Sequence, residues 1–233
     1  LTPTIATLRA APDAQGISQV FSALMQAPAP ERQALAQSVA HACRERAGKS
    51  ARFADELRWG ARIADLYPGD VGLVISLLLN LVRLAPGEAI YLPAGNLHAY
   101  LDGTGVELMA SSDNVLRGGL TPKHVNVPEL LSILDFRPLP SEIVRPVARG
   151  AEQIYATPAP EFELSRFELT GSEASVSVAG PEIWLVTEGK VTLWPSEGQP
   201  LALARGRSAF VGADTTTLRL SGNGRIFRAK VGG

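Results

Sequence analysis

One histidine stands in a spacing that is typical of metal-binding β-structure. Gly87 is followed after five residues by Pro93, then by Gly95 and, three residues later, by His98. The Pro-Ala-Gly sequence predicts a tight corner at the end of a strand. A side chain three residues beyond such a corner can point into a barrel, and imidazole binds zinc, iron, nickel or copper. His98 is therefore a candidate metal ligand, whereas the default reading of a lone histidine is a core residue with a satisfied hydrogen bond.

Further polar side chains follow this histidine. Tyr100 lies two residues beyond His98 and would share its face of a strand, where its hydroxyl could meet a polar substrate; a core aromatic ring is the alternative. Glu107 lies in the apolar stretch VELMA, so its carboxylate points either to solvent or into a site that shifts its pKa. Glu88 and Asp102 are expected to be structural, and His41 and His124 to lie on the surface.

Arg117 is the permanently charged group of this region. It precedes Gly118 and Gly119, and two glycines would let the backbone bend so that the guanidinium enters a pocket. The alternative is an ordinary surface turn. Asp113 lies four residues before Arg117 and either holds that arginine in place or caps a turn, as aspartate commonly does.

Composition narrows the class of protein. A chain of 233 residues, 45% of them hydrophobic, fits two or three domains with real cores. Its net charge of −1, with both signs interspersed, does not suggest a nucleic-acid partner. The longest apolar run, 71–84, is interrupted by Asn80 and Arg83 and is too short to cross a bilayer. The single cysteine, Cys43, excludes an internal disulfide framework and favours a cytoplasmic location.

Helical periodicity dominates the first part of the chain. Residues 1–82 are expected to form a helical domain with a clear turn at 67–70. The helices are expected over 17–27, 29–47, 51–66 and 72–84.

After Pro86 the helical periodicity gives way to short runs in which apolar and polar residues alternate. This pattern predicts β-structure to about residue 127, followed by a short helix over 128–134. The proline-rich segment 137–150 resembles a linker. Seven further strands predict a small sandwich or barrel: 162–169, 174–178, 183–187, 190–194, 208–211, 216–220 and 225–231.

Both β-regions resemble cupin motifs. The spacing from Gly87 to His98 resembles the second cupin motif, with Asp102 in the place of its asparagine. The spacing Glu182-x6-Gly189 resembles the tail of the first cupin motif, but no His-x-His precedes it, and Thr217 stands where a ligand histidine would be. We therefore expect residues 151–233 to be a cupin-like packing module without metal ligands.

Longer segments resemble type I mannose-6-phosphate isomerase, a family of the cupin superfamily. They include YPGDVG at 67–72, HAY at 98–100, VELMA at 106–110 and SDNVLRGGLTPK at 112–123. The resemblance is dense from 67 to 123 and loose elsewhere. It implies an α+β fold: the helical domain (1–82), the second half of a metal-binding jelly-roll barrel (83–136), a linker (137–150) and a degenerate cupin-like domain (151–233).

The resemblance also implies an activity, the interconversion of mannose 6-phosphate and fructose 6-phosphate through a cis-enediol, with Zn²⁺ as cofactor. It assigns His98 to the metal and Tyr100 and Lys123 to the phosphosugar substrate. Lys123, otherwise a surface lysine, would help to hold the phosphate. The catalytic residues it implies are Arg117, Glu107 and Asp113.

The family's remaining ligands, a Gln-x-His pair and a glutamate, belong to an N-terminal barrel half that this sequence lacks. One imidazole does not complete a metal site. The chain is therefore expected to be inactive alone, either as a fragment or as the partner of a separate chain. Two other classes stay open: a non-catalytic sugar-phosphate-binding protein and a different metal-dependent cupin enzyme, such as an oxygenase.

Overall fold

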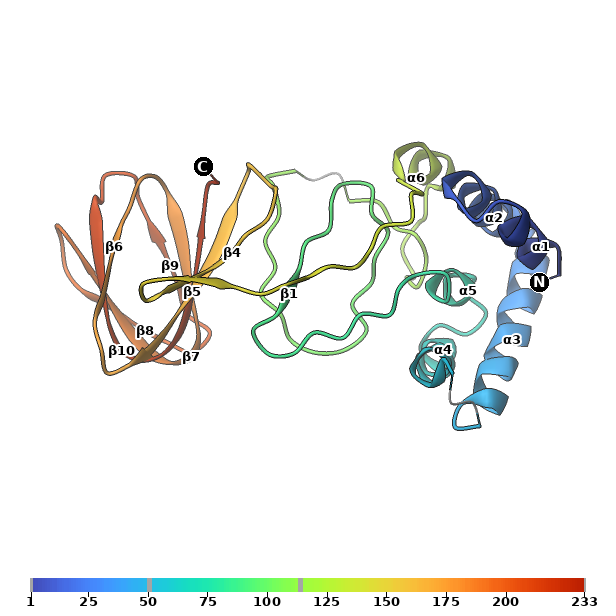
Figure 1. Cartoon of the computed structure of the whole chain (residues 1–233), viewed down its shortest axis with the longest axis horizontal. Coiled ribbons are helices and arrows are strands. Elements are labelled where there is room, and N and C mark those ends of the chain that lie inside the picture. Colours follow the sequence, from blue (N-terminus) through green and yellow to red (C-terminus); the bar gives the residue numbers. More distant parts are fainter. Residues whose placement is uncertain (1, 50–51, 113–114, 233) are drawn as a thin grey trace. The chain divides into compact units, whose positions relative to one another are not determined.

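Helices form the first part of the chain and an antiparallel sheet the last (Figure 1). The computed structural model describes residues 2–49, 52–112 and 115–232. Its residues fall into two compact units that interleave along the sequence. The first comprises Leu1–Arg83, Leu92–Thr104 and Asp113–Ser141, and the second comprises Leu84–Tyr91, Gly105–Ser112 and Glu142–Gly233. The α+β class expected from the sequence is confirmed at this level.

The first unit contains the helices, and local signals explain where several of them begin. The side chain of Asp13 accepts a hydrogen bond from the N–H of Gly16 at 3.1 Å, and that of Asn126 accepts one from Glu129 at 3.3 Å. Pro30 occupies a first-turn position, where its missing N–H costs nothing. The helices are α1 (Thr2–Ala10), α2 (Ala14–Gln26), α3 (Ala29–Arg46), α4 (Ala54–Leu66), α5 (Gly72–Ser76) and α6 (Val127–Ile133). Within the described ranges, each helix is too short or too polar to traverse a bilayer.

The helix expected over 72–84 is five residues long, α5, and the prediction of its length was wrong. The rest of that apolar run does not continue the helix. Instead, Leu73, Val74 and Ile75 are buried, whereas Leu77 and Leu78 are exposed by 37% and 41%. The short element places three apolar side chains in the core and then ends.

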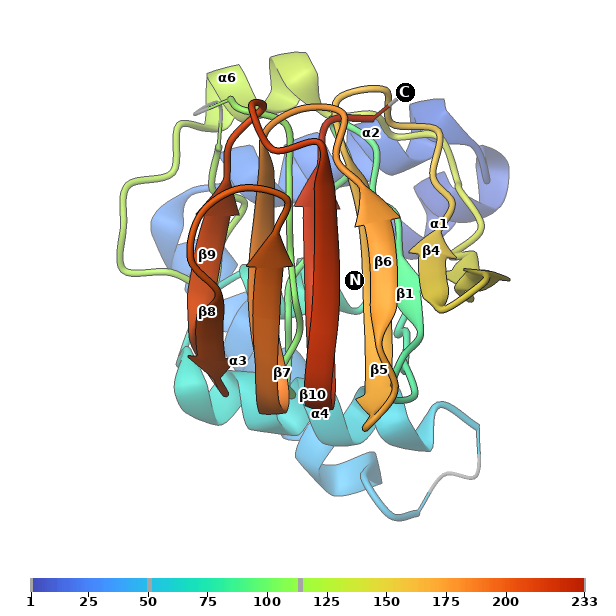
Figure 2. The same cartoon turned by 90° about the vertical axis from the view of Figure 1, so that its left-hand side faces the viewer.

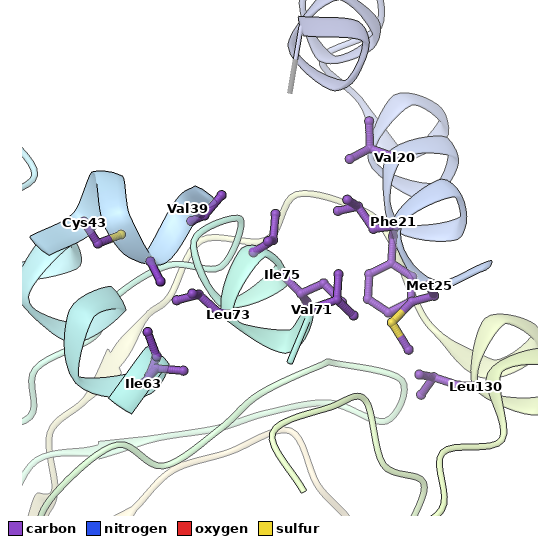
Figure 3. Close-up of a cluster of buried hydrophobic side chains, with 14 residues drawn as sticks. Val20, Phe21, Met25, Val39, Cys43, Ile63, Val71, Leu73, Ile75 and Leu130 are labelled. Atoms are coloured by element: carbon purple, nitrogen blue, oxygen red, sulfur yellow. The ribbon is translucent and has the colours of Figure 1, made fainter. Parts of the chain in front are cut away.

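Most helices of the first unit bury the side chains of one face in a common hydrophobic core (Figure 3). Val20, Phe21, Leu24 and Met25 recur at the spacing of a single helical face and are at most 5% exposed. Residues of the irregular segments that carry the candidate site also pack against this core, among them Leu97, Leu116, Leu120 and Val125. The helical core therefore supports the segments that carry His98, Arg117 and Lys123.

The second unit contains an antiparallel sheet, shown face-on in Figure 2. Its main path runs β3-β4-β5-β10-β7-β8, and β6 and β9 pair with β10 and β7. Alternation along β7 places Trp184, Val186, Val191 and Leu193 inside, each at most 2% exposed. The strands are β3 (Val147–Arg149), β4 (Glu152–Tyr155), β5 (Glu163–Thr170), β6 (Ala174–Ser177), β7 (Glu182–Pro195), β8 (Leu201–Ala204), β9 (Ser208–Val211) and β10 (Thr217–Lys230).

Two strands are longer than the sequence predicts. Segments 183–187 and 190–194 belong to one strand, β7, and segments 216–220 and 225–231 are joined in β10. The intervening glycines predicted turns but lie inside the ladder, where Gly189 pairs with Gly224. A Cβ at Gly189 would lie 2.1 Å from the carbonyl oxygen of Asn223. Glycine therefore lets the backbones of β7 and β10 come close together here, and it does not end the strand.

Regular strands are scarce where the second barrel half was expected. Among the described residues of 83–136, the only strand is β1 (Ala89–Ile90), which pairs with β2 (Ile143–Val144). The expectation of a sheet to residue 127 is therefore not met in this chain. A strand exists only through the partner that pairs with its backbone. From Val106 to Ala110, half-buried and exposed residues still alternate with the two-residue period of a strand.

Candidate functional site

His98 is an exposed residue, and one of its two ring nitrogens forms a hydrogen bond with the backbone. Its Nδ1 lies 2.8 Å from the carbonyl oxygen of Asn96. A carbonyl can only accept a hydrogen bond, so Nδ1 is the donor here, and in a neutral ring this tautomer leaves the lone pair on Nε2. A backbone bond of this kind fixes the tautomer and the ring orientation of metal-ligating histidines. The side chain is exposed in this chain and so lies outside its helical core.

Tyr100 lies beside this histidine. The two ring centroids are 6.0 Å apart with the planes tilted by 48°, and Tyr100 is 71% exposed. The ring is therefore not part of either hydrophobic core of this chain. The phenol therefore lies next to the imidazole on the surface of the first unit.

Arg117 is held next to the His98 segment by a glycine contact. A Cβ at Gly118 would lie 2.6 Å from Cδ1 of Leu97, the residue immediately before His98. Leu116 and Leu97 both pack against the helical core, whereas Arg117 and His98 are exposed. The two segments thus touch through their inward-facing residues. Within the part of the chain that the structure describes, the guanidinium of Arg117 forms no hydrogen bond or ion pair.

Lys123 follows on the same loop. Its backbone N–H donates to Oγ1 of Thr121 at 3.1 Å, which closes a small turn, and its ammonium group is exposed. The loop thus carries two exposed cations, Arg117 and Lys123, without a carboxylate paired to either among the described residues. Such a loop can attract an anionic ligand.

Among the described residues, the first unit contains neither of the two predicted carboxylates. Glu107 belongs to the second unit, where it is exposed between half-buried Val106 and Leu108. Asp113 lies outside the described residues. The first unit contains four of the predicted residues: His98, Tyr100, Arg117 and Lys123.

A metal ion at His98 would need further ligands from outside the described residues. No group of three or more histidine, cysteine, aspartate or glutamate residues within the described ranges could hold a metal ion. Asp102 pairs with Arg62 at 3.2 Å, as expected of a structural residue. Glu88 accepts the N–H of Ala85, and this bond, more than the nearby Arg145, lowers the pKa of the Glu88 carboxyl. The residues present thus fit a site in which His98 would supply one ligand.

The sheet of the second unit holds a buried polar cluster that the sequence did not reveal. Glu182 is 2% exposed and accepts from Nε of Arg228 at 2.9 Å and from Nε1 of Trp184 at 3.0 Å. Arg228, 5% exposed, also donates to Glu152 at 3.1 Å and to the carbonyl of Ser177 at 2.7 Å. The glutamate that resembles part of a cupin motif is thus paired with a guanidinium. Arg228 lies two residues beyond inward-facing Ile226 and therefore on the same face of β10, and that spacing was the available signal.

Known proteins resemble this chain over nearly its whole length. The mannose-6-phosphate isomerase of Escherichia coli is 36% identical over 230 residues, which cover 97% of this chain and 56% of that protein. The isomerase of Rattus norvegicus is 41% identical over 175 residues, or 70% of this chain and 41% of that protein. No protein-family model matches the chain.

Solved structures agree with the sequence comparison. The apo and the zinc-bound mannose 6-phosphate isomerase structures, the former from Salmonella typhimurium, each superpose with a TM-score of 0.86 at 36% identity. Each match covers 99% of this chain and 58% of the solved one. The chain therefore belongs to the mannose-6-phosphate isomerase family, and it spans a little more than half the length of its bacterial relatives.

Proposed function

We propose that the complete protein to which this chain belongs interconverts mannose 6-phosphate and fructose 6-phosphate. The observation that carries the proposal is the contact between Leu97 and Gly118, which joins the segment of His98 to the loop of Arg117. An oriented imidazole and a guanidinium without a partner among the described residues are thereby held on neighbouring segments. The isomerisation needs a fixed cation near the oxygen that gains charge as the proton moves between C1 and C2.

His98 is proposed to hold zinc through Nε2, with the remaining ligands supplied by the rest of the protein. A bound zinc ion would polarise the sugar carbonyl or orient its hydroxyls. Zinc is favoured because one solved relative is described as zinc-bound. The hydrogen bond from Nδ1 to Asn96 keeps the ring aimed for this role.

The other residues of the first unit take roles that follow from their chemistry. Arg117 stabilises the developing oxyanion, because its planar guanidinium stays charged and can donate two parallel hydrogen bonds. Lys123 attracts the phosphate as a point charge. Tyr100 offers a hydroxyl to the sugar. Glu107 and Asp113 are proposed to complete the catalytic group, and the base that removes the carbon-bound proton is left unassigned.

Substituted relatives support this assignment. Two solved structures from Salmonella typhimurium carry alanine in place of a glutamate and of an arginine ten positions apart, which is also the spacing from Glu107 to Arg117. Other variants replace two lysines and a histidine that lie further before that arginine than Leu1 lies before Arg117. Functional groups of the enzyme are therefore proposed to reside partly upstream of this sequence.

The missing portion is proposed to be the first half of a cupin-type jelly-roll barrel. Residues 83–136 would form the second half, after the helical domain 1–82, and would gain strand partners when the barrel is complete. Segment 137–150 would link it to the cupin-like domain 151–233. The strand-like alternation from Val106 to Ala110, without an assigned strand, supports this reading. The buried single thiol of Cys43 suits a cytoplasmic protein.

An isomerase assay of two proteins tests the proposal. The complete zinc-loaded protein should convert mannose 6-phosphate to fructose 6-phosphate, and residues 1–233 alone should not, even with added zinc. Turnover by residues 1–233 alone would contradict the missing barrel half. No turnover by the complete protein would contradict the function, and iron-dependent oxygen consumption would instead identify a different cupin enzyme.

A further inference from the structure

We propose that Asp70 is a positioning residue that fixes the loop carrying Arg117 and Lys123. Asp70 lies in the turn between α4 and α5, within the segment YPGDVG. Its Oδ1 accepts the backbone N–H of Gly72 at 2.7 Å, and its Oδ2 accepts that of Leu120 at 3.0 Å. One carboxylate thus joins two segments that are fifty residues apart in sequence. The inference rests on the proposed function of the two cations.

Leu120 occupies the midpoint of the loop, three residues from Arg117 and three from Lys123. Its backbone has φ of 52°, in the left-handed region, and the preceding Gly119 has φ of 131°. A leucine rarely adopts this conformation, so its surroundings must hold it there. The hydrogen bond from Asp70 is made to the N–H of this same residue. The two hydrogen bonds of Asp70, called the clamp below, therefore act at the residue whose backbone has the unfavourable left-handed conformation.

Glycines on both sides of the clamp allow the two backbones to touch. A Cβ at Gly72 would lie 2.9 Å from the backbone nitrogen of Leu120, and a Cβ at Gly119 would lie 3.1 Å from Cα of Gly72. Aspartate suits this junction because each of its oxygens can accept one N–H over a short reach. Asparagine would offer one accepting oxygen and turn an N–H₂ group towards the other N–H.

Packing does not enclose this junction on every side. A cavity of about 520 Å³ lies beside it, lined in part by Gly69, Asp70, Gly119 and Val125. The loop therefore has room to relax on that side if the hydrogen bond is lost. Because Leu120 is central, relaxation would displace Arg117 and Lys123 together. A shift of about 1 Å in a catalytic group can lower a rate on the order of a hundredfold.

The test uses the complete protein with Asp70→Asn, and with Asp65→Asn as the matched control. Asp65 is an exposed residue of α4 that pairs with Arg44 on the surface. Asp70→Asn should lower kcat for mannose 6-phosphate by about tenfold to a hundredfold and should raise KM. Zinc content and the thermal unfolding midpoint should stay close to those of the Asp65→Asn control, because both segments remain packed on the helical core.

Amide hydrogen exchange gives a readout that does not depend on activity. The Leu120 amide should exchange at least tenfold faster in Asp70→Asn than in the control. Unchanged kcat and KM together with a protected Leu120 amide would overturn the inference. A loss of kcat that merely follows lost zinc or lost folded protein would also overturn it, because the role would then be structural. If the unmodified protein lacks isomerase activity, the proposed function fails, and exchange at Leu120 still decides whether the clamp exists.

Discussion

Gly118 lies against Leu97, and a Cβ at Gly118 would come within 2.6 Å of the leucine Cδ1. The residue after Arg117 therefore touches the residue before His98. This contact connects the two groups that the proposed chemistry needs, a metal ligand and a fixed cation. Its geometry leaves no space for a larger residue than glycine, so it can be tested by adding a single methyl group.

Gly118→Ala should therefore reduce stability and activity together. The new methyl group must displace Leu97 or the loop, and overpacking of this kind typically costs about 1–3 kcal/mol. Urea unfolding of residues 1–233 measures the stability change, and kcat of the complete protein measures the effect on the site. Gly180→Ala is the control, because a Cβ there meets nothing within 4 Å. Equal behaviour of the two variants would show that the contact is not tight.

Arg117 and Lys123 should differ in their kinetic signatures. Arg117→Lys keeps the charge but loses the planar fork, so it should lower kcat substantially with a smaller change in KM. Lys123→Ala should mainly raise KM, because a phosphate anchor acts in both the ground state and the transition state. Steady-state kinetics with mannose 6-phosphate on the complete protein distinguishes the two. A silent Arg117→Lys, or one that changes only KM, would refute the role given to the arginine.

The buried cluster of the second unit should be a determinant of stability. Arg228→Met removes the cation that faces Glu182 and leaves a carboxylate buried without its ion pair, at a cost of about 3–5 kcal/mol. Arg219→Met, on the same strand with 43% of its side chain exposed, should change stability by less than about 1 kcal/mol. Denaturant unfolding of both variants makes the comparison. If Arg228→Met is as stable as Arg219→Met, the cluster does not hold the sheet together.

Local signals were enough for much of the fold. Helical periodicity and the Pro30 first turn located α3, and alternation located β9 at the expected residues. The glycines of β7 and β10 were misleading, because a glycine that permits close backbone approach has the same sequence signature as one that forms a turn. The strands expected between 83 and 127 depend on partners, and a strand's partner cannot be found from its own residues.

The candidate site was predictable only where a motif carries it. The spacing around His98 and the glycines after Arg117 marked the two segments that the structure places in contact. The clamp formed by Asp70 was not visible, because it joins residues fifty positions apart through backbone atoms. All residues except proline have a backbone N–H group, so no pattern of side chains in the sequence predicts such a hydrogen bond.

Zinc content of the complete protein with His98→Ala tests the central claim most directly. The unmodified protein and the control His124→Ala, which changes another exposed histidine, should each hold about one zinc ion per chain. His98→Ala should lose zinc and isomerase activity together, while its circular dichroism spectrum stays unchanged, because His98 lies outside the helical core. Full zinc occupancy in His98→Ala would contradict the account and make this histidine a structural residue.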